Sequence, residues 1–374
     1  MKGSIRMGSL FGIPFYINPS WFFVLGIVTL TYGSSLRGLF PELIGILPWI
    51  LGFIAALLLF SSVLAHELGH SFVAIAQGIP VKSITLFIFG GLATLEKESE
   101  TPLQAFLVAI AGPVVSLLLF VLFATISVSV PLAAPIKAIV SLLATINLVL
   151  ALFNLIPGLP LDGGNVLKSI VWKITGNPNK GVIFAGRVGQ IFGWLAVITG
   201  ALGIFGISPI GDIWTLFIGW FLLQNAGFAA QSASVNEKLS KYTAEDAIIE
   251  NSPIVPANLT IRGFVNDYVI GKEEWRKFLV TNEEGQLIGE IKTEDLKQIP
   301  TSQWTEVKIA ELVTESKNIP IVKSDRSLIE VIQLIEKENL KELVVVKEDG
   351  VVLGLLEKNS IIDLLQQEAE ANAV

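Results

Sequence analysis

The sequence predicts a membrane-embedded all-α domain of six transmembrane helices with a small membrane-associated β-hairpin or sheet, followed by a soluble α/β domain pair. Two observations predict this division. Composition is the first, because 52% of the 374 residues are hydrophobic and the mean hydropathy is +0.66. The second is charge: 10 of the 26 basic and 7 of the 33 acidic residues precede residue 233, and 16 and 26 follow it. Such asymmetry is typical of a membrane domain with a water-soluble tail.

Six stretches of the first part carry almost no formal charge, and each is long enough to cross a bilayer, which takes roughly 20 residues of helix. These stretches are residues 6–37, 42–66, 101–136, 138–161, 188–211 and 213–236. We assign residues 1–232 to the membrane domain, 233–242 to a linker, 243–300 to a first soluble domain, and 301–374 to a second soluble domain with the C-terminal tail. No cysteine is present, so disulfides and cysteine chemistry are excluded.

Basic residues in the short connections fall mainly on one side of the six stretches. That side carries Lys2, Arg6, Lys82, Lys97, Lys168, Lys173, Lys180 and Arg187, and the opposite side carries only Arg37 and Lys137. Because cytoplasmic loops are enriched in Lys and Arg, we expect a multi-pass protein of the cell (plasma) membrane with both termini and the soluble tail in the cytoplasm. The acidic excess of the tail disfavours nucleic acid as a partner.

The only two histidines of the chain lie in the pentapeptide His66-Glu67-Leu68-Gly69-His70, towards the cytoplasmic end of the second predicted span. On a helix, positions i and i+4 project from one face, so two imidazoles can bind one ion with the glutamate beside it. A zinc-bound water has a pKa near neutrality, and an adjacent carboxylate can take its proton. An accidental pentapeptide is the alternative, but ionisable groups at this depth favour function.

A catalytic zinc site usually has three protein ligands, so a third is expected elsewhere. Apart from Glu67, the only acid associated with the apolar stretches away from their outer ends is Asp162. The residues Pro157, Gly158 and Pro160 break the preceding helix, which frees the chain to turn this carboxylate towards the metal. A helix-ending turn capped by a solvated Asp162 is the alternative. The predicted site lies within the membrane near the cytoplasmic face.

Asn154 lies in the same broken segment. Its neutral amide can donate to a developing oxyanion or bind the backbone of a substrate. An interhelical hydrogen bond is the competing role. The residues alone leave both roles open.

The two motifs His66-Glu-Leu-Gly-His70 and Asn154-x-x-Pro157-x-x-x-Leu161-Asp162-Gly163 together resemble the site-2 protease family of intramembrane metalloproteases. The resemblance extends from residue 1 to about residue 230, and it includes two glycine-containing segments. These are Gly90-Gly91 and Ala111-Gly112-Pro113. One departure is Asn165, where many relatives have arginine.

This resemblance implies that His66, His70 and Asp162 bind one zinc ion. It implies that Glu67 is the catalytic acid and base, and that Asn154 assists substrate or oxyanion binding. The implied substrate is a membrane protein with a single transmembrane segment, cleaved within or near the lipid bilayer. Iron, cobalt or manganese can also occupy such a site, so zinc is an inference.

Residues 82–95 are rich in β-branched and aromatic side chains and contain a glycine pair, which predicts a membrane-associated hairpin. A helical substrate hides its carbonyl groups, so an exposed strand edge that pairs with an unwound segment would help cleavage. A purely structural hairpin is the alternative. Proline in place of Phe87 or Phe89 distinguishes the two roles by the cleavage rate.

The tail contains two copies of one α/β unit, at residues 243–297 and 308–365, with their glycine pairs 65 residues apart. The copies resemble a tandem pair of CBS domains, which in many proteins bind adenine nucleotides. Nucleotide-binding copies usually have Ser or Thr three residues after the second glycine and Asp six residues after it. The corresponding residues here are Lys292 and Asp295, then Glu357 and Ser360. A homodimerisation or substrate-gating module is the plainer interpretation.

Paired CBS domains also occur on ion-transport proteins, so a transporter or channel is the second hypothesis. The His-Glu-x-x-His motif with a third-ligand aspartate favours an enzyme, because it provides a reactive open metal site. A catalytically inactive relative that only binds is a third hypothesis. It is disfavoured because the predicted ligands and Glu67 are all present.

Overall fold

The computed structural model describes residues 3–88, 90–271, 275–314 and 319–371. It divides into two compact units, Met1–Ser234 and Val235–Val374, and each is described by itself. Six helices of the described residues are long and apolar enough to cross a membrane, as the sequence predicts.

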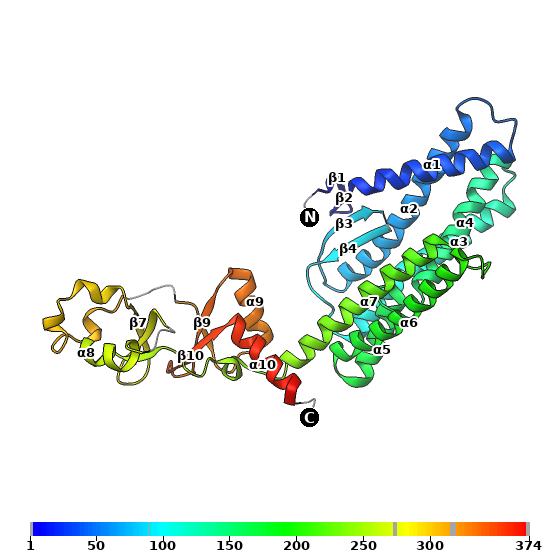
Figure 1. The fold of residues 1–374 in the computed structure, drawn as a ribbon. Coiled ribbons are helices and arrows are strands. Elements are labelled where there is room, and N and C mark those ends of the chain that lie inside the picture. The colour runs from blue at the N-terminus through cyan, green and yellow to red at the C-terminus, as the bar shows by residue number, and fades with distance from the viewer. Residues whose placement is uncertain (1–2, 89, 272–274, 315–318, 372–374) are drawn as a thin grey trace. The chain divides into compact units, whose positions relative to one another are not determined.

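The six apolar helices form the bulk of the first unit (Figure 1). They are α1 (Pro19–Leu39), α2 (Leu47–Ala76), α3 (Pro102–Ser129), α4 (Ala134–Asn154), α6 (Pro178–Ile204) and α7 (Ile213–Leu239). Asn18, Thr101 and Asn177 cap the starts of α1, α3 and α6 with their side chains, and proline follows each cap directly. The last helix, α7, continues into the stretch that the sequence predicts as a linker.

A four-stranded sheet in the order β1-β2-β3-β4 packs beside the helices, with β4 along α2 (Figure 1). Its strands are β1 (Ile5–Leu10), β2 (Ile13–Ile17), β3 (Val81–Phe87) and β4 (Gly90–Leu95). The antiparallel pair β3 and β4 is the predicted hairpin, whose Phe89 lies outside the described residues. The β1–β2 hairpin is not predicted by the sequence, and β2 joins β3 in parallel.

A short amphipathic helix, α5 (Asp162–Thr175), occupies part of what the sequence predicts as a connection. It ends at Gly176, whose φ of 71° is the left-handed conformation that favours glycine. At its start a Cβ on Gly163 would overlap the carbonyl groups of residues 155 and 156, and one on Gly164 would overlap the backbone of residues 158 and 159. The start of α5 is therefore pressed onto the broken segment after α4, and this contact fixes the position of Asp162.

The second unit contains two three-stranded sheets of the same topology. The first has β5 (Ile254–Pro256), β6 (Lys277–Thr281) and β7 (Leu287–Lys292), and the second has β8 (Ile321–Lys323), β9 (Glu342–Val346) and β10 (Val352–Glu357). In each copy a parallel pair is followed by an antiparallel hairpin. Gly285 and Gly350 hold the two hairpin turns at φ values of 80° and 85°, which confirms the predicted repeat.

The two copies differ in their helices. The second copy has α9 (Leu328–Glu338) and a long closing helix, α10 (Lys358–Ala371). In the first copy the corresponding elements are the short helix α8 (Ile261–Phe264) with the π-helical turn η2 (Val265–Val269), and the 3-10 turn η3 (Asp295–Gln298). The remaining 3-10 turns are η1 (Ala244–Ala247), η4 (Thr301–Gln303) and η5 (Ile309–Glu311).

A buried apolar cluster and one ion cluster join the two copies. Leu279 of β6 packs with Val344 and Leu355 of the second sheet. Beside them Lys277 donates to Glu342 Oε1 at 2.6 Å and lies 3.0 Å from Glu290 Oε2. The positive charge of this lysine is thus shared between a carboxylate of its own copy and one of the other copy.

Candidate metal centre

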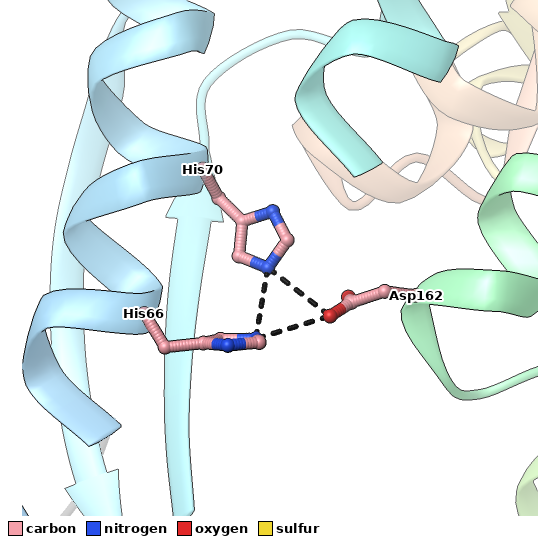
Figure 2. Close-up of side chains that lie close together, drawn as sticks. All are labelled: His66, His70 and Asp162. Carbon is pink, nitrogen blue, oxygen red and sulfur yellow. Dashed lines mark hydrogen bonds and ion pairs between the residues drawn. The ribbon is translucent and has the colours of Figure 1, made fainter. Parts of the chain in front are cut away.

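The side chains of His66, His70 and Asp162 point towards one another in the first unit (Figure 2). His66 and His70 lie one turn apart on α2, so both rings leave the same face of the helix. Asp162 reaches them from the start of α5. His66 is buried, with 3% of its surface exposed, and the side chain of Asp162 is 18% exposed.

The three facing atoms have the spacing of metal ligands. His66 Nε2 lies 3.0 Å from Asp162 Oδ2 and 3.2 Å from His70 Nε2, and His70 Nε2 lies 3.3 Å from Asp162 Oδ2. Ligands of a tetrahedral zinc ion with bonds of about 2.0–2.1 Å are roughly 3.3 Å apart. Two imidazole nitrogens and one carboxylate oxygen are also a donor set that zinc accepts. The residues therefore fit a single metal ion.

The other ring nitrogens support this fit. His70 Nδ1 lies 2.7 Å from the carbonyl oxygen of Val108. A carbonyl only accepts, so Nδ1 carries a proton, and a ring without a second proton would direct the lone pair of Nε2 at the metal position. His66 Nδ1 lies 2.9 Å from the hydroxyl of Ser116. Both partners belong to α3, which packs against α2.

Space for the ion depends on a glycine of α3. A Cβ on Gly112 would overlap His70 Nε2 and would lie 2.6 Å from His66 Nε2. The same two helices also approach closely at the neighbouring residues, where a Cβ on Gly69 would lie 3.0 Å from the carbonyl oxygen of Ala111. Any side chain at Gly112 would therefore compete with a metal for the point on which the ligands converge.

Glu67 lies beside this group and is not part of it. Its Oε2 accepts a hydrogen bond of 3.1 Å from the backbone N–H of Ala93 on β4. The strand can approach so closely because residue 91 is glycine, where a Cβ would overlap Glu67 Cγ. One carboxylate oxygen of Glu67 is thereby fixed by the sheet, and the side chain lines the same cavity as the ligands.

This cavity has a volume of about 530 Å³ and is lined by α2, α3, α4, α5 and β4. All five residues predicted from the sequence, His66, Glu67, His70, Asn154 and Asp162, lie on its wall. Asn154 occupies the last position of α4. Among the described residues its amide has no hydrogen-bond partner, so it makes none of the interhelical hydrogen bonds that the alternative role requires.

Three residues of α3 support the group: Val108, Gly112 and Ser116. Of these three residues, the sequence singles out only Gly112, within Ala111-Gly112-Pro113, and gives it no role. Their spacing of four residues places them on one face of the helix. That periodicity is visible in the sequence, but its meaning depends on knowing that this face packs against His66 and His70.

Comparisons with known proteins identify relatives of this chain. A model of peptidase family M50 matches residues 54–136 and 128–196, and a CBS domain model matches residues 309–367. The Synechocystis sp. protein sll0528, a zinc metalloprotease by name, is 62% identical over 99% of this chain and 97% of its own. Rip3 of Mycobacterium tuberculosis, also a zinc metalloprotease by name, is 28% identical over 98% and 93% of the two chains. A solved site-2 protease from Methanocaldococcus jannaschii shares 28% identity over 61% of this chain and 95% of its own, with a TM-score of 0.42.

Fold and site together define a multi-pass membrane metalloprotease. The chain belongs to peptidase family M50, the site-2 protease family, and carries a C-terminal CBS domain. The prediction of an enzyme rather than a transporter is thereby confirmed.

Proposed function

We propose that this protein hydrolyses a peptide bond in or near the transmembrane segment of another membrane protein. The observation that carries the proposal is the convergence of His66, His70 and Asp162 within 3.3 Å of one another, in a cavity that Glu67 also lines. Because the wall of this cavity is built largely from membrane-spanning helices, a substrate can be cleaved at membrane depth.

In this proposal His66, His70 and Asp162 hold one zinc ion per chain. When bound, zinc supplies an acidified water as the nucleophile. Glu67 takes a proton at its free carboxylate oxygen and later gives it to the leaving amine. The Ala93 N–H fixes the other oxygen of Glu67, which reduces the freedom of the side chain and holds the base in place.

Asn154 has the role of a substrate-facing donor. Its unpartnered amide lies on the cavity wall, where it can hydrogen-bond a substrate carbonyl or a developing oxyanion. Support comes from its position at the end of α4, because the broken segment that follows leads directly to Asp162.

The strand β4 is the proposed docking edge for an unwound substrate segment. Among the described residues it pairs only with β3, so its other edge offers backbone groups apart from the Ala93 N–H, which donates to Glu67. Residues 90–93 of this strand line the cavity together with the predicted ligands. A substrate strand added here would lie beside the metal ligands, and its exposed carbonyl groups would be available for attack.

Glu67→Gln tests the mechanism. We expect this variant to keep its zinc, because Glu67 is not a ligand, and to lose at least about 100-fold in the cleavage rate of a model single-span substrate. Metal content is measured by elemental analysis of the purified full chain, and cleavage by gel mobility. Glu100→Gln, which neutralises an exposed carboxylate before α3, is the matched control with unchanged activity. A Glu67→Gln protein with zinc and full activity would contradict the mechanism.

We propose a plasma-membrane location with both termini and the tail in the cytoplasm, on the strength of the Lys and Arg bias of the connections. The metal centre then lies within the membrane near the cytoplasmic face. The tail acts as a regulatory or dimerisation module in this arrangement.

An adenine nucleotide does not fit the tail well. The side chain of Asp295 accepts a hydrogen bond from Lys292 N, and that of Ser360 accepts one from Glu357 N, so both are engaged in local turns. A cavity of about 410 Å³ beside Ser360 is lined by four acidic residues and by no lysine or arginine of the described chain. The acidic residues are Asp246, Glu250, Glu357 and Asp363. Their charge repels phosphate, which favours a tail that works through protein contacts.

A further inference from the structure

Ser116 is fully buried in the middle of α3, and His66 Nδ1 is the one partner that the structure gives its hydroxyl. The distance between Ser116 Oγ and His66 Nδ1 is 2.9 Å, and His66 is itself 97% buried. A buried hydrogen bond between two side chains of different apolar helices is costly to leave half-made. This contact therefore constrains the ring of His66.

The two histidines are supported in different ways. The Val108 carbonyl can only accept, so it fixes the proton of His70 on Nδ1. The Ser116 hydroxyl can either donate or accept, so it tolerates both neutral tautomers of His66. Only the tautomer with the proton on Nδ1 leaves Nε2 free to bind a metal. The hydroxyl oxygen can accept a hydrogen bond from that Nδ1–H group.

We propose that Ser116 is the positioning residue of His66: its Oγ accepts a hydrogen bond from the Nδ1–H of His66, and thereby aims the lone pair of Nε2 at the point shared with His70 and Asp162. Partners of this kind orient ligand histidines in metal sites, and their loss typically weakens metal binding about 10–100-fold. The inference rests on the proposed function, since it assumes that the three residues hold a metal.

Matched variants distinguish this role from a merely structural one. Ser116→Thr and Ser116→Val add nearly the same volume to a buried position, and they differ in the presence of the hydroxyl. Ser127→Ala is the control, because Ser127 is a buried serine of the same helix whose hydroxyl lies 2.7 Å from that of Ser141 on α4. It removes an interhelical hydrogen bond of α3 without touching the site.

Zinc affinity is measured on the full chain in detergent by competition with a chelator. We expect Ser116→Ala to bind zinc about 10–100-fold more weakly than the wild type, and Ser116→Thr to bind at least about tenfold more tightly than Ser116→Val. Ser127→Ala should stay within about threefold of the wild type, since its serine contacts no ligand. With cobalt in place of zinc, the visible absorption bands should shift in Ser116→Ala and Ser116→Val but not in Ser127→Ala, because they report ligand geometry.

Equal affinities of the Thr and Val variants would overturn the inference, and so would a loss in Ser127→Ala as large as that in Ser116→Ala. If Ser116→Ala does not fold, the Thr and Val pair decides the question. A wild-type chain that binds no metal would contradict the proposed function itself. A wild-type chain that binds zinc, with all Ser116 variants binding equally well, would contradict only the role of Ser116.

Discussion

Two clusters of polar side chains, one in each unit of the molecule, differ in the source of their positive charge. His66, His70 and Asp162 turn three acceptor atoms towards one point, and no Lys or Arg of the described chain forms an ion pair with them. In the second unit, Lys277 stands between Glu290 and Glu342 and forms ion pairs with both. The positive charge of the first cluster must come from a metal ion or from a proton on a histidine, and the second cluster supplies its own through Lys277.

This difference separates a functional site from a structural contact. Buried acceptors at 3.0–3.3 Å repel one another unless a proton or a metal lies between them. The lysine cluster satisfies its carboxylates internally, so it can join the two copies of the tail without any ligand. Convergence of acceptors without a cation of the chain is thus a better sign of a metal site than a count of charged residues.

Filling the space of the metal should produce the largest effect. We expect Gly112→Ala to weaken zinc binding by at least about 100-fold, because the new Cβ overlaps the position on which the two Nε2 atoms converge. Proteolysis should fall with it. The measurement is chelator competition on the purified chain, together with cleavage of a single-span substrate.

Gly26→Ala is the matched control for this prediction. Gly26 also lies inside an apolar helix, α1, but a Cβ there has nothing within 4 Å. Alanine favours a helix over glycine by about 1 kcal/mol, so neither substitution should disturb its helix as such. A Gly112→Ala chain with wild-type zinc affinity would mean that zinc does not bind beside Gly112, where the Nε2 atoms of His66 and His70 lie. The contrast between a metal-binding cluster and an internally paired cluster would then be lost.

The three residues of the candidate metal centre could be singled out in the sequence, because histidine and aspartate are rare in or beside apolar stretches. His66 and His70 stand out by their motif, and elimination points to Asp162 as the third residue. Their supports on α3 carry no such mark. Val108 contributes a backbone carbonyl and Gly112 contributes the absence of a side chain, so chemistry alone cannot reveal them.

The fold, too, has parts that the sequence predicts and parts that it does not. The six long helices follow from runs of apolar residues, which are local features of the chain. The β1–β2 hairpin could not be predicted. Most residues of β1 are exposed, and β2 joins the sheet by parallel pairing with the distant strand β3, where Phe15 lies opposite Ile84. Such a register depends on packing between distant segments, which no local pattern encodes.

Asn154→Ala tests whether the metal-binding group of the first unit consists only of His66, His70 and Asp162. Asn154 lines the same cavity but is not part of the convergent group. We expect zinc affinity to stay at the wild-type value and the turnover rate to fall about 100-fold, which is typical for the loss of one oxyanion donor. Loss of zinc from Asn154→Ala would instead place the asparagine in the metal-holding set.

Lys277→Met should have the smallest effect, because it alters a cluster that is partly open to water. The lysine side chain is 36% exposed, and solvent screens such pairs, so we expect a loss of about 1 kcal/mol in the stability of the tail. For a unit of this size that is a shift of roughly 3 °C in the unfolding temperature. Zinc affinity should not change, since the cluster belongs to the other unit.

The pH dependence of this loss follows from the pKa of Lys277. Burial alone lowers that pKa, but the hydrogen bonds and charges of Glu342 and Glu290 outweigh burial and hold it above the ordinary value of 10.5. A raised lysine pKa stabilises the folded state fully below 10.5, and the contribution disappears as the pH rises through the folded pKa. The difference between wild type and Lys277→Met, measured by thermal unfolding of the full chain in detergent, should therefore be constant from about pH 7 to 9 and shrink only above the unfolded value. If the wild type and Lys277→Met were equally stable at neutral pH, the ion pairs of Lys277 would not stabilise the tail, and the contrast with the metal centre would fail.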